Sequence, residues 1–261
     1  MKVLITGSDG YIGGNLTSYL KSKDIETEGI DSANGKNILN YNDYNGLDAI
    51  VHLAGVSGIT QCNDNLESAT TNNVVSSIMI FNAARKYEIP LIFTSSQAAK
   101  NPHSNIYALT KKMCEIEADR VNRCYGNIKM FRLTNVYGGI GYLEKKDTVI
   151  SRFIKAVKKN EDIIINGTGS QIRDFIHMND VCEAIFKGLL YTHNINYPID
   201  IGTGRPLSIL DIAEMFNHRF TFDKKSDKIG IGVNVADIYP AYKELGFLAN
   251  EVIEDYIERM K

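Results

Sequence analysis

The sequence lacks the features by which several classes of protein are recognised. Its four cysteines, at positions 62, 114, 124 and 182, include no C-x-x-C pair. We therefore expect reduced thiols, and neither a disulfide framework nor a zinc site. The five histidines are dispersed without metal-binding spacing, and His177 lies in an apolar stretch that suits a packed strand residue. No metal site is predicted.

Neither an excess of charge nor a long apolar run is present. The chain has 29 Lys and Arg against 31 Asp and Glu, a formal net charge of −2, which predicts neither nucleic acid nor an anionic membrane as a partner. No run could span a bilayer, and MKVLITG reaches its first glycine too early for a signal peptide, so a cytoplasmic location is expected. A hydrophobic content of 44% over 261 residues is ordinary for a globular protein.

Short apolar runs alternate with stretches of helical period. Strands are expected over 3–7, 27–31, 49–55, 90–96 and 127–138, and helices over 11–21, 66–88 and from Tyr107 onward. Buried strands separated by helices predict an α/β fold with a doubly wound parallel sheet, Rossmann-like in type. After Gly138 the rhythm changes. We therefore expect one domain over 1–137, with a returning strand near 198–202, and a smaller lobe over 138–261.

The first expected strand runs directly into GSDGYIGG, where Gly7, Gly10 and Gly13 form G-x-x-G-x-x-G. Glycines at a strand-to-helix turn let the backbone approach a pyrophosphate, and the helix N-terminus supplies N–H groups. Asp31 ends the second strand and can accept hydrogen bonds from ribose hydroxyls. Its carboxylate would repel a 2′-phosphate, and residues 32–34 include no arginine. The pattern predicts a dinucleotide site that prefers NAD to NADP.

The stretch TSSQAAKNPHSNIYALTKK (94–112) combines Ser96, at the end of a strand, with Tyr107 and Lys111. A spacing of four residues places Tyr107 and Lys111 on one face of a helix. An ammonium beside a phenol lowers a pKa that is ordinarily about 10, which suits proton transfer near neutral pH. Taken alone, the same spacing also fits a surface pair.

In chain order, the glycine motif, Asp31, HLAG (52–55), Ser96 and Tyr107-x-x-x-Lys111 resemble the extended short-chain dehydrogenase/reductases. The similarity is greatest to their nucleotide-sugar epimerase/dehydratase branch. It covers nearly the whole chain and includes FRLTNVYG, IDIGTGRPLSILDIAEMF and ADIYPAYKELGF. The most specific stretch is QIRDFIHMND (171–180), which is typical of enzymes that act on sugars carried by a nucleoside diphosphate.

The resemblance implies a role for each matching residue. Tyr107 would be the acid/base, Lys111 would hold the nicotinamide ribose and tune the tyrosine, and Ser96 would hydrogen-bond the reacting oxygen. Asn135 and Arg173 would meet the substrate diphosphate, for which a charge-assisted arginine contact is suited. The NAD site would comprise Gly7, Gly10, Tyr11, Ile12, Gly13, Asp31, Ser32, Asn37, Leu53, Ala54, Gly55, Asn73, Tyr107 and Lys111.

The resemblance also implies partners. The substrate would be a nucleoside-diphosphate sugar, bound mainly by Ser96, Asn135 and Arg173. A homodimer would form through the helix of Tyr107 and the preceding long helix, in which Val74, Ile78 and Phe81 recur at helical spacing.

The sequence departs from the family pattern at three places. The segment between Ser96 and Tyr107 is only QAAKNPHSNI, which trims one wall of the expected pocket. Asn37 stands where an acidic residue often contacts adenine. The segment DKIGIGVNVAD contains Lys228 but no second arginine for the diphosphate.

In the family that the chain resembles, four reactions share this scaffold. Gln97 and Ala98 occupy the place of the Asp-Glu pair of the 4,6-dehydratases and of the decarboxylase glutamate, so neither of those reactions is expected. A 4-epimerase needs only the serine, tyrosine, lysine and a bound NAD, and 4-epimerisation of a nucleoside-diphosphate hexose is our first expectation. A 4-ketosugar reductase uses the same groups and remains the alternative. A non-catalytic NAD-binding relative would usually have lost the tyrosine or the lysine.

Overall fold

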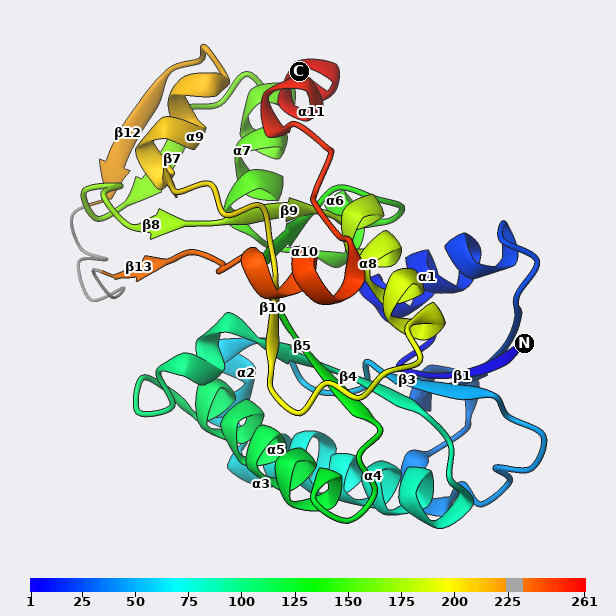
Figure 1. The fold of residues 1–261 in the computed structure, drawn as a ribbon. Helices are drawn as coiled ribbons and strands as arrows, with labels where there is room; N and C mark the ends of the chain where they lie inside the picture. Colours follow the sequence, from blue (N-terminus) through cyan, green and yellow to red (C-terminus); the bar gives the residue numbers. More distant parts are fainter. Residues whose placement is uncertain (224–231) are drawn as a thin grey trace. The chain divides into compact units, whose positions relative to one another are not determined.

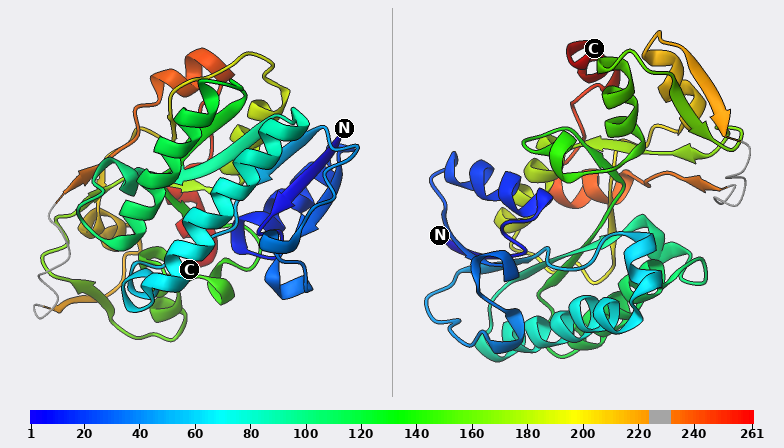
Figure 2. Two further views of the ribbon diagram at one scale, coloured as in Figure 1. Left: turned by 90° about the horizontal axis from the view of Figure 1, so that it is seen from below. Right: turned by 180° about the vertical axis from the view of Figure 1, so that it is seen from behind.

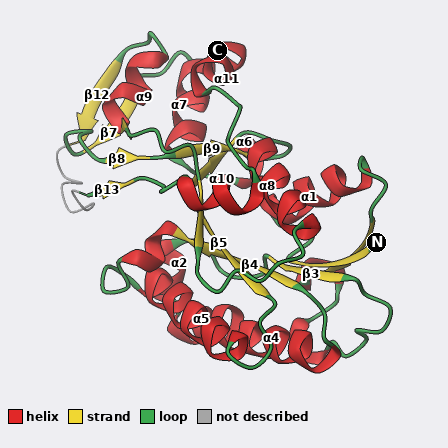
Figure 3. Ribbon diagram, viewed as in Figure 1, coloured by secondary structure: helices red, strands yellow, loops and turns green. Residues whose placement is uncertain are grey.

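The computed structural model describes residues 1–223 and 232–261, and Lys228 lies outside them. The chain forms two compact units, residues 1–133 with 184–200, and residues 134–183 with 201–261. The strands are β1 (Lys2–Thr6), β2 (Glu26–Ile30), β3 (Ala49–His52), β4 (Leu91–Ser96), β5 (Ile128–Leu133), β6 (Asn135–Tyr137), β7 (Ile163–Asn166), β8 (Ile172–Arg173), β9 (Phe175–His177), β10 (Ile199–Ile201), β11 (Leu207–Ser208), β12 (Phe220–Asp223) and β13 (Val233–Asn234). Figure 3 colours these strands and the helices between them.

The α-helices are α1 (Tyr11–Lys21), α2 (Ile59–Asp64), α3 (Leu66–Ala69), α4 (Ser76–Tyr87), α5 (Ile106–Asn122), α6 (Tyr142–Lys145), α7 (Val149–Lys158), α8 (Met178–Leu190), α9 (Ile209–Met215), α10 (Tyr239–Leu245) and α11 (Ile253–Met260). Shorter turns are the 3-10 segments η1 (Ser32–Asn34), η2 (Ile38–Asn40) and η4 (Gln97–Lys100), and one π-helical turn, η3 (Thr70–Val75). None of the helices among the described residues is both long enough and apolar enough to cross a membrane.

A six-stranded sheet in the order β10-β5-β4-β3-β1-β2 forms the centre of the first unit (Figure 1). From β2 to β5 each neighbouring pair is parallel. The predicted doubly wound α/β fold is therefore confirmed, and the strand expected near 198–202 belongs to the sheet as β10. Chain order reverses between β1 and β3, and ligands of such sheets bind beyond the carboxyl ends of the strands at this switch point.

The strands are buried because helices cover both faces of the sheet. Helices α4 and α5 run side by side along one face and α1 covers the other (Figures 1 and 2). All six residues of β4 lack charge and all but its last are buried, which explains why its sequence does not alternate. Phe81, Phe93 and Phe131 are among the largest fully buried side chains.

The expected single strand over 127–138 is broken at Thr134. Its first part, β5, pairs with β4 from Leu91–Ile128 to Ser96–Leu133. Its second part, β6, pairs in parallel with β9 of the second unit. The peptide N–H of Thr134 donates to the carbonyl of Ile201 instead of continuing the β4 ladder. The two halves therefore have different partners, although the sequence reads as a single strand.

The second unit contains three small sheets. β7 pairs in parallel with β12, and β8 lies between β11 and β13. Helices α7 and α9 pack against β7, where the Phe153 and Phe216 rings meet edge to face with centroids 6.0 Å apart. His177 is buried in β9, as the sequence predicted, and its ring contacts those of Tyr137 and Tyr256.

Candidate active site

The turn between β1 and α1 brings its glycines against neighbouring backbone. Gly7 has a φ of +74°, and a Cβ on it would lie 2.8 Å from the amide nitrogen of Ala54. A Cβ on Gly13 would lie 2.0 Å from the carbonyl oxygen of Gly7, and one on Gly10 would lie 3.0 Å from the same atom. These contacts hold α1 close to β1, and no side chain caps its first turn. An uncapped helix N-terminus beside a glycine turn suits a pyrophosphate.

Asp31 ties the end of β2 to the glycine turn. Its Oδ1 accepts from the peptide N–H of Ala33 at 2.9 Å, and its Oδ2 accepts from that of Asp9 at 3.1 Å. Each carboxylate oxygen can accept a further hydrogen bond. The predicted ribose contact is therefore compatible with these bonds, and Asp31 also has a structural role that the sequence did not indicate. Ser32 begins η1 directly after it.

Three other predicted cofactor residues lie in local turns. Tyr11 and Ile12 are the first two residues of α1, so their peptide groups belong to its N-terminal turn. Asn37 is exposed, and its side-chain oxygen accepts from the Leu39 N–H at 2.9 Å, which caps η2. This cap explains Asn37 without a ligand, and its adenine role stays a prediction.

The predicted segment Leu53–Gly55 follows β3 and connects the glycine turn to the helix α5. The φ of Gly55 is +153°, and a Cβ on it would lie 2.8 Å from the side-chain oxygen of Asn73. Asn73 binds both the N–H and the carbonyl of Val56, at 2.7 and 3.1 Å, and donates to the Thr110 hydroxyl at 3.0 Å. Contacts among the described residues thus run without a break from the glycine turn to the helix that contains Tyr107.

The helix expected over 66–88 is interrupted at Asn73. The segment η3 is a π-helical turn, a feature that often marks functional positions. The carbonyl of Asn73 accepts from the Ser77 hydroxyl and from the Cys114 thiol, the latter at 3.2 Å. The turn therefore places the Asn73 side chain against the loop after β3 while its backbone carbonyl binds side chains of α4 and α5.

Ser96, Tyr107 and Lys111 come together within the first unit. Burial raises the pKa of the Tyr107 phenol above its ordinary value, and a side-chain hydrogen bond with Ser96 acts in the opposite direction. Burial also lowers the pKa of the Lys111 ammonium, whose Nζ donates to the Thr94 carbonyl at 2.9 Å. The same Nζ lies 5.1 Å from the centre of the Phe93 ring. The serine and tyrosine side chains are thus neighbours, while the lysine binds the strand β4.

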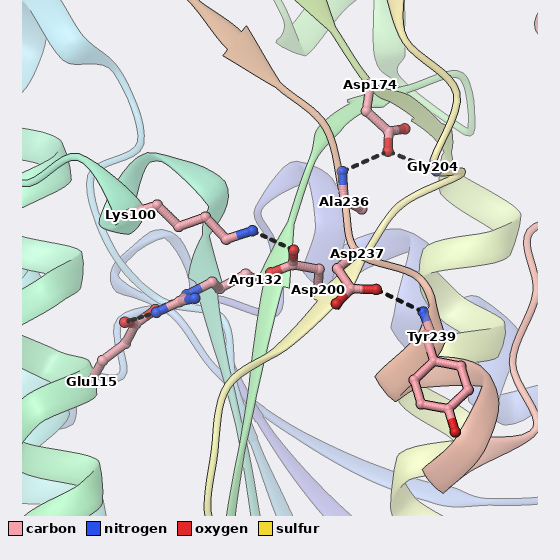
Figure 4. A network of polar contacts seen from close by, with 9 residues as sticks. All are labelled: Lys100, Glu115, Arg132, Asp174, Asp200, Gly204, Ala236, Asp237 and Tyr239. Carbon is pink, nitrogen blue, oxygen red and sulfur yellow. Dashed lines mark hydrogen bonds and ion pairs between the residues drawn. The ribbon is translucent and has the colours of Figure 1, made fainter.

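Two ion pairs surround this site within the first unit (Figure 4). Glu115, buried on α5, accepts two hydrogen bonds from Arg132 of β5, at 2.7 and 2.6 Å, and one from the Ser95 hydroxyl at 2.7 Å. Lys100 of η4 donates to the buried Asp200 of β10 at 2.5 Å. Bidentate and charge-assisted bonds of this kind are strong and directional. They fasten α5, which contains Tyr107, and η4, which follows Ser96, to the sheet.

Asp174 organises the predicted substrate residues of the second unit. Its carbonyl accepts from both the backbone N–H and the side-chain amide of Asn135, at 3.0 and 2.9 Å. Its fully buried carboxylate accepts from the N–H and hydroxyl of Thr203 and from the N–H groups of Gly204 and Ala236 (Figure 4). Asp174 therefore holds three chain segments together beside Asn135.

Arg173 precedes Asp174 on β8. One of its terminal nitrogens donates to the carbonyls of Ile172 and Gly232, at 2.8 and 2.7 Å. Within residues 1–223 and 232–261 no carboxylate forms an ion pair with it, since Asp174 and Asp180 accept from backbone N–H groups. Partial burial lowers the pKa of the guanidinium, which nevertheless stays charged at neutral pH. A half-buried cation that is bound only to carbonyls is well prepared for an anion.

The sequence did not indicate several residues that the structure shows to be important. His52 was read only as part of HLAG, yet it connects Thr6 to Ser77 through its two ring nitrogens. Asp174 lies within QIRDFIHMND but was given no role of its own. His52 could have been singled out as a polar residue between apolar neighbours, and no such signal marks Asp174. Across the described part of the chain, no cluster of three metal-binding side chains is found.

Comparison with known proteins agrees with this geometry. The chain is 27% identical over 266 residues to a UDP-glucuronate 4-epimerase of Thermodesulfobacterium geofontis, covering 94% of this chain and 80% of the relative. It is 27% identical over 236 residues to a GDP-6-deoxy-D-talose 4-dehydrogenase of Aggregatibacter actinomycetemcomitans, covering 82% and 79%.

A solved structure shows the same fold over the whole chain. The UDP-glucuronic acid 4-epimerase of Bacillus cereus, in complex with UDP-glucuronic acid and NAD, superposes with a TM-score of 0.85 at 22% identity and covers 99% of this chain and 97% of its own. Residues 3–200 match the family described as the NAD-dependent epimerase/dehydratase family. This match spans most of the sequence and includes the glycine turn, Asp31 and the three residues Ser96, Tyr107 and Lys111. The chain therefore belongs to the NAD-dependent epimerase/dehydratase family.

Proposed function

We propose that this protein is an NAD-dependent 4-epimerase of a nucleoside-diphosphate hexose. The observation that carries the proposal is that the Ser96 hydroxyl lies close enough to the Tyr107 phenol to influence its pKa, on a helix whose next turn contains the buried Lys111. A phenol and a hydroxyl that lie side by side can both form hydrogen bonds with the oxygen on C4 of the sugar. Oxidation and reduction at C4 both require proton transfer at that oxygen.

The residues present fit NAD. Bound NAD would accept a hydride from C4 and return it to the opposite face of the sugar. The glycine turn and the uncapped start of α1 would hold the pyrophosphate, and Asp31 would accept from the ribose hydroxyls. Lys111 would exchange its bond to the Thr94 carbonyl for the nicotinamide ribose.

Tyr107 would move the proton of the C4 hydroxyl. Because burial raises its pKa, the phenol of the unliganded protein is protonated at neutral pH. Removal of a substrate proton therefore depends on positive charge brought near the phenol in the complex, from Lys111 and the oxidised cofactor. Ser96 would donate to or accept from the same oxygen and keep it in line with the phenol.

On the substrate side, Arg173 and Asn135 would bind the diphosphate. The guanidinium lacks a carboxylate partner among the described residues, and Asn135 is held by its two bonds to the Asp174 carbonyl. Arginine forms charge-assisted and frequently bidentate bonds with phosphate. NAD is thus assigned to residues of the first unit, and the diphosphate to residues of the second.

Replacing Tyr107 by phenylalanine tests the mechanism. Only a hydroxyl is lost, so the variant should fold and bind NAD, while turnover of a UDP-, dTDP-, GDP- or CDP-hexose should fall about 10²–10⁴-fold. Tyr125→Phe is the matched control, because the Tyr125 hydroxyl is buried without a hydrogen-bond partner among the described residues, and it should keep normal turnover. Near-normal turnover of Tyr107→Phe would refute the mechanism.

The state of the cofactor distinguishes the two candidate reactions. An epimerase should retain NAD through purification and need none added, whereas a 4-ketosugar reductase would consume one reduced cofactor for each product. Absorbance of the purified protein and of the reaction mixture separates these outcomes.

A homodimer through α4 and α5 forms part of the proposal. Of the three apolar residues named for the long helix, Val74 and Phe81 lie in the core of the first unit and Ile78 packs against it. Exposed apolar side chains of η3, α4 and α5 include Val75, Met79, Leu109, Met113 and Ile116. They recur at spacings of three or four residues, so each helix presents one apolar stripe to solvent. A second copy related by a two-fold axis would cover both stripes at once.

Light scattering at micromolar concentration tests the dimer. Ile116→Glu should produce a monomer, since Ile116 is 60% exposed and central to the stripe. Leu248→Glu, at a similarly exposed apolar position in the second unit, should leave the dimer unchanged. A wild-type monomer would refute this part of the proposal. A reducing, cytoplasmic location is also proposed, because all four cysteines are free thiols and three of them are buried.

A further inference from the structure

Gln97, the residue after Ser96, has a buried side-chain amide without partners. The residue is only 3% exposed, and both its amide oxygen and its amide nitrogen lack a hydrogen-bond partner among the described residues. Four other residues have one such atom each, namely Tyr125, Thr134, Tyr137 and Gln171. Gln97 alone in this described set has both of its polar atoms unpaired.

Such an arrangement costs free energy that the fold does not require. An amide has two donors and two acceptor sites, and burial without partners forfeits the bonds it made to water. The next two residues of η4 are Ala98 and Ala99, so an apolar side chain would suit this short turn. A buried polar group without a hydrogen-bond partner in a native protein calls for a specific explanation. A hydrogen bond to a bound ligand is one such explanation, and it suits a residue that directly follows Ser96.

The position of Gln97 relative to Ser96 specifies which part of a ligand it would meet. The Ser96 hydroxyl accepts from the N–H of Ala98 at 3.2 Å, so η4 begins by folding around Ser96. The Ser96 hydroxyl also lies next to the Tyr107 phenol, whose pKa it lowers. A sugar oxygen that reaches these two hydroxyls brings the substituents of the adjoining carbons close to the next residue of the chain, since consecutive Cα atoms are about 3.8 Å apart.

The chemistry of the amide specifies the class of substituent. A carboxamide is neutral and offers a donor and an acceptor together. A hydroxyl or an acylamino group can satisfy both. A carboxylate could accept from the nitrogen but would face the amide oxygen with a second acceptor, which is unfavourable in a buried site.

We propose that Gln97 is a specificity-determining residue, whose amide binds the neutral hydroxymethyl group on C5, next to the reacting C4, and so favours neutral sugars over uronic acids, which have a carboxylate at this place. The proposal rests on the proposed function, because it takes the ligand to be a sugar whose reacting oxygen meets Ser96 and Tyr107.

Gln97→Met provides the test, since methionine has a similar length and no hydrogen-bonding amide. Binding of UDP-glucose, UDP-N-acetylglucosamine and UDP-glucuronic acid is measured by calorimetry on the NAD-loaded protein, together with turnover and with urea unfolding of the unliganded protein. We expect unchanged or higher stability, unchanged NAD affinity, and about tenfold weaker binding of the neutral sugars. Binding of UDP-glucuronic acid should change much less. The exposed Gln61→Met should alter none of these quantities.

Two results would overturn the proposal. If Gln97→Met is less stable and binds all three sugars as the wild type does, the amide is a structural group satisfied by a buried water. If stability and binding are both unchanged, the amide has no role in recognition. A wild type that binds these sugars without converting any of them would refute the proposed function alone, because binding still tests Gln97. A wild type that binds none of the three would refute both.

Discussion

Acid should destabilise this protein through His52. The ring is fully buried between β1 and α4, with Nδ1 2.6 Å from the Thr6 hydroxyl and Nε2 2.9 Å from the Ser77 hydroxyl. The Thr6 hydroxyl oxygen accepts from the N–H of Ala54, and the Ser77 hydroxyl donates to the carbonyl of Asn73. Because the Ser77 hydroxyl has already donated its only hydrogen, Nε2 of His52 must donate to Ser77. Nδ1 of the neutral ring then has no hydrogen and accepts from the Thr6 hydroxyl, which fixes the tautomer.

A proton added to His52 has no acceptor in this chain of bonds. Burial, together with the nearby charge of Lys111, lowers the pKa of His52 to about 3. An unfolded histidine has a pKa of about 6.5. Between these two values the unfolded state binds more protons than the folded state, so stability rises with pH. The contribution is complete above about pH 6.5 and is lost as the pH falls toward 3.

The magnitude follows from the difference between the two pKa values. Each pH unit below 6.5 costs about 1.4 kcal/mol, so lowering the pH to 5 should remove about 2 kcal/mol of the free energy of unfolding through His52 alone. This is a large share of the 5–15 kcal/mol that is typical of folded domains. The loop after β3, which contains predicted NAD contacts, is fastened to His52 through Thr6 and should loosen first.

Urea unfolding at pH 7 and pH 5 measures the effect. His52→Gln removes the titrating ring, so it should be less stable at pH 7 but should lose about 2 kcal/mol less than the wild type between the two pH values. His103→Gln, at an exposed histidine, should retain the full wild-type loss. If His52→Gln and the wild type lose the same stability on acidification, His52 titrates normally and the deduced hydrogen-bond chain is wrong.

Three further predictions concern ligand binding. Asp31→Ala should weaken the binding of NAD far more than that of NADP. Because Asp31 also accepts from the N–H of Asp9, Asp31→Asn, which keeps an acceptor oxygen, should lose less affinity overall. An unchanged ratio of the NAD and NADP affinities in fluorescence titrations would contradict the ribose assignment. Lys111→Ala should both slow turnover and loosen NAD, and normal NAD affinity in that variant would exclude the ribose contact. Arg173→Met should weaken nucleotide-sugar binding about ten- to a hundredfold, which is the contribution of a charge-assisted hydrogen bond, and should leave the affinity for NAD unchanged. If calorimetry found equal losses of affinity for both ligands, Arg173 would be a structural residue.

The parts of the fold that the sequence predicted are those set by local pattern. The glycine turn was predicted because its steric demands act between residues close in the chain, as the contact of Gly13 with Gly7 shows. The helix start at Ile106 follows from a local cap, in which the Asn105 side chain accepts from the N–H of Ala108. Ser96 and Tyr107 were predicted to meet because a strand end and the next helix start lie beside each other in such sheets.

The parts that could not be predicted depend on partners distant in the sequence. FRLTNVYG is apolar enough for one strand, but β5 and β6 pair with strands that lie about 40 residues away on opposite sides along the chain. The helix over 66–88 has an unbroken apolar period, and its π-helical turn forms where Asn73 binds Val56 and Thr110. The same pattern could not indicate that Val74 and Phe81 face the core while Val75 and Met79 face solvent, because the direction of a helix face is set by the sheet beneath it.

The short segment between Ser96 and Tyr107 is held at both ends by contacts of its own. At its start, the Ser96 hydroxyl caps η4, and Lys100 pairs with the buried Asp200. At its end, the N–H of Ile106 donates to the side chain of Asn63. A buried carboxylate that lost its cation would be strongly unfavourable, so the pair holds η4 to β10 as long as the unit is folded. The trimmed segment is therefore a fixed connection, and it keeps the Ser96 hydroxyl next to the Tyr107 phenol although the segment is short.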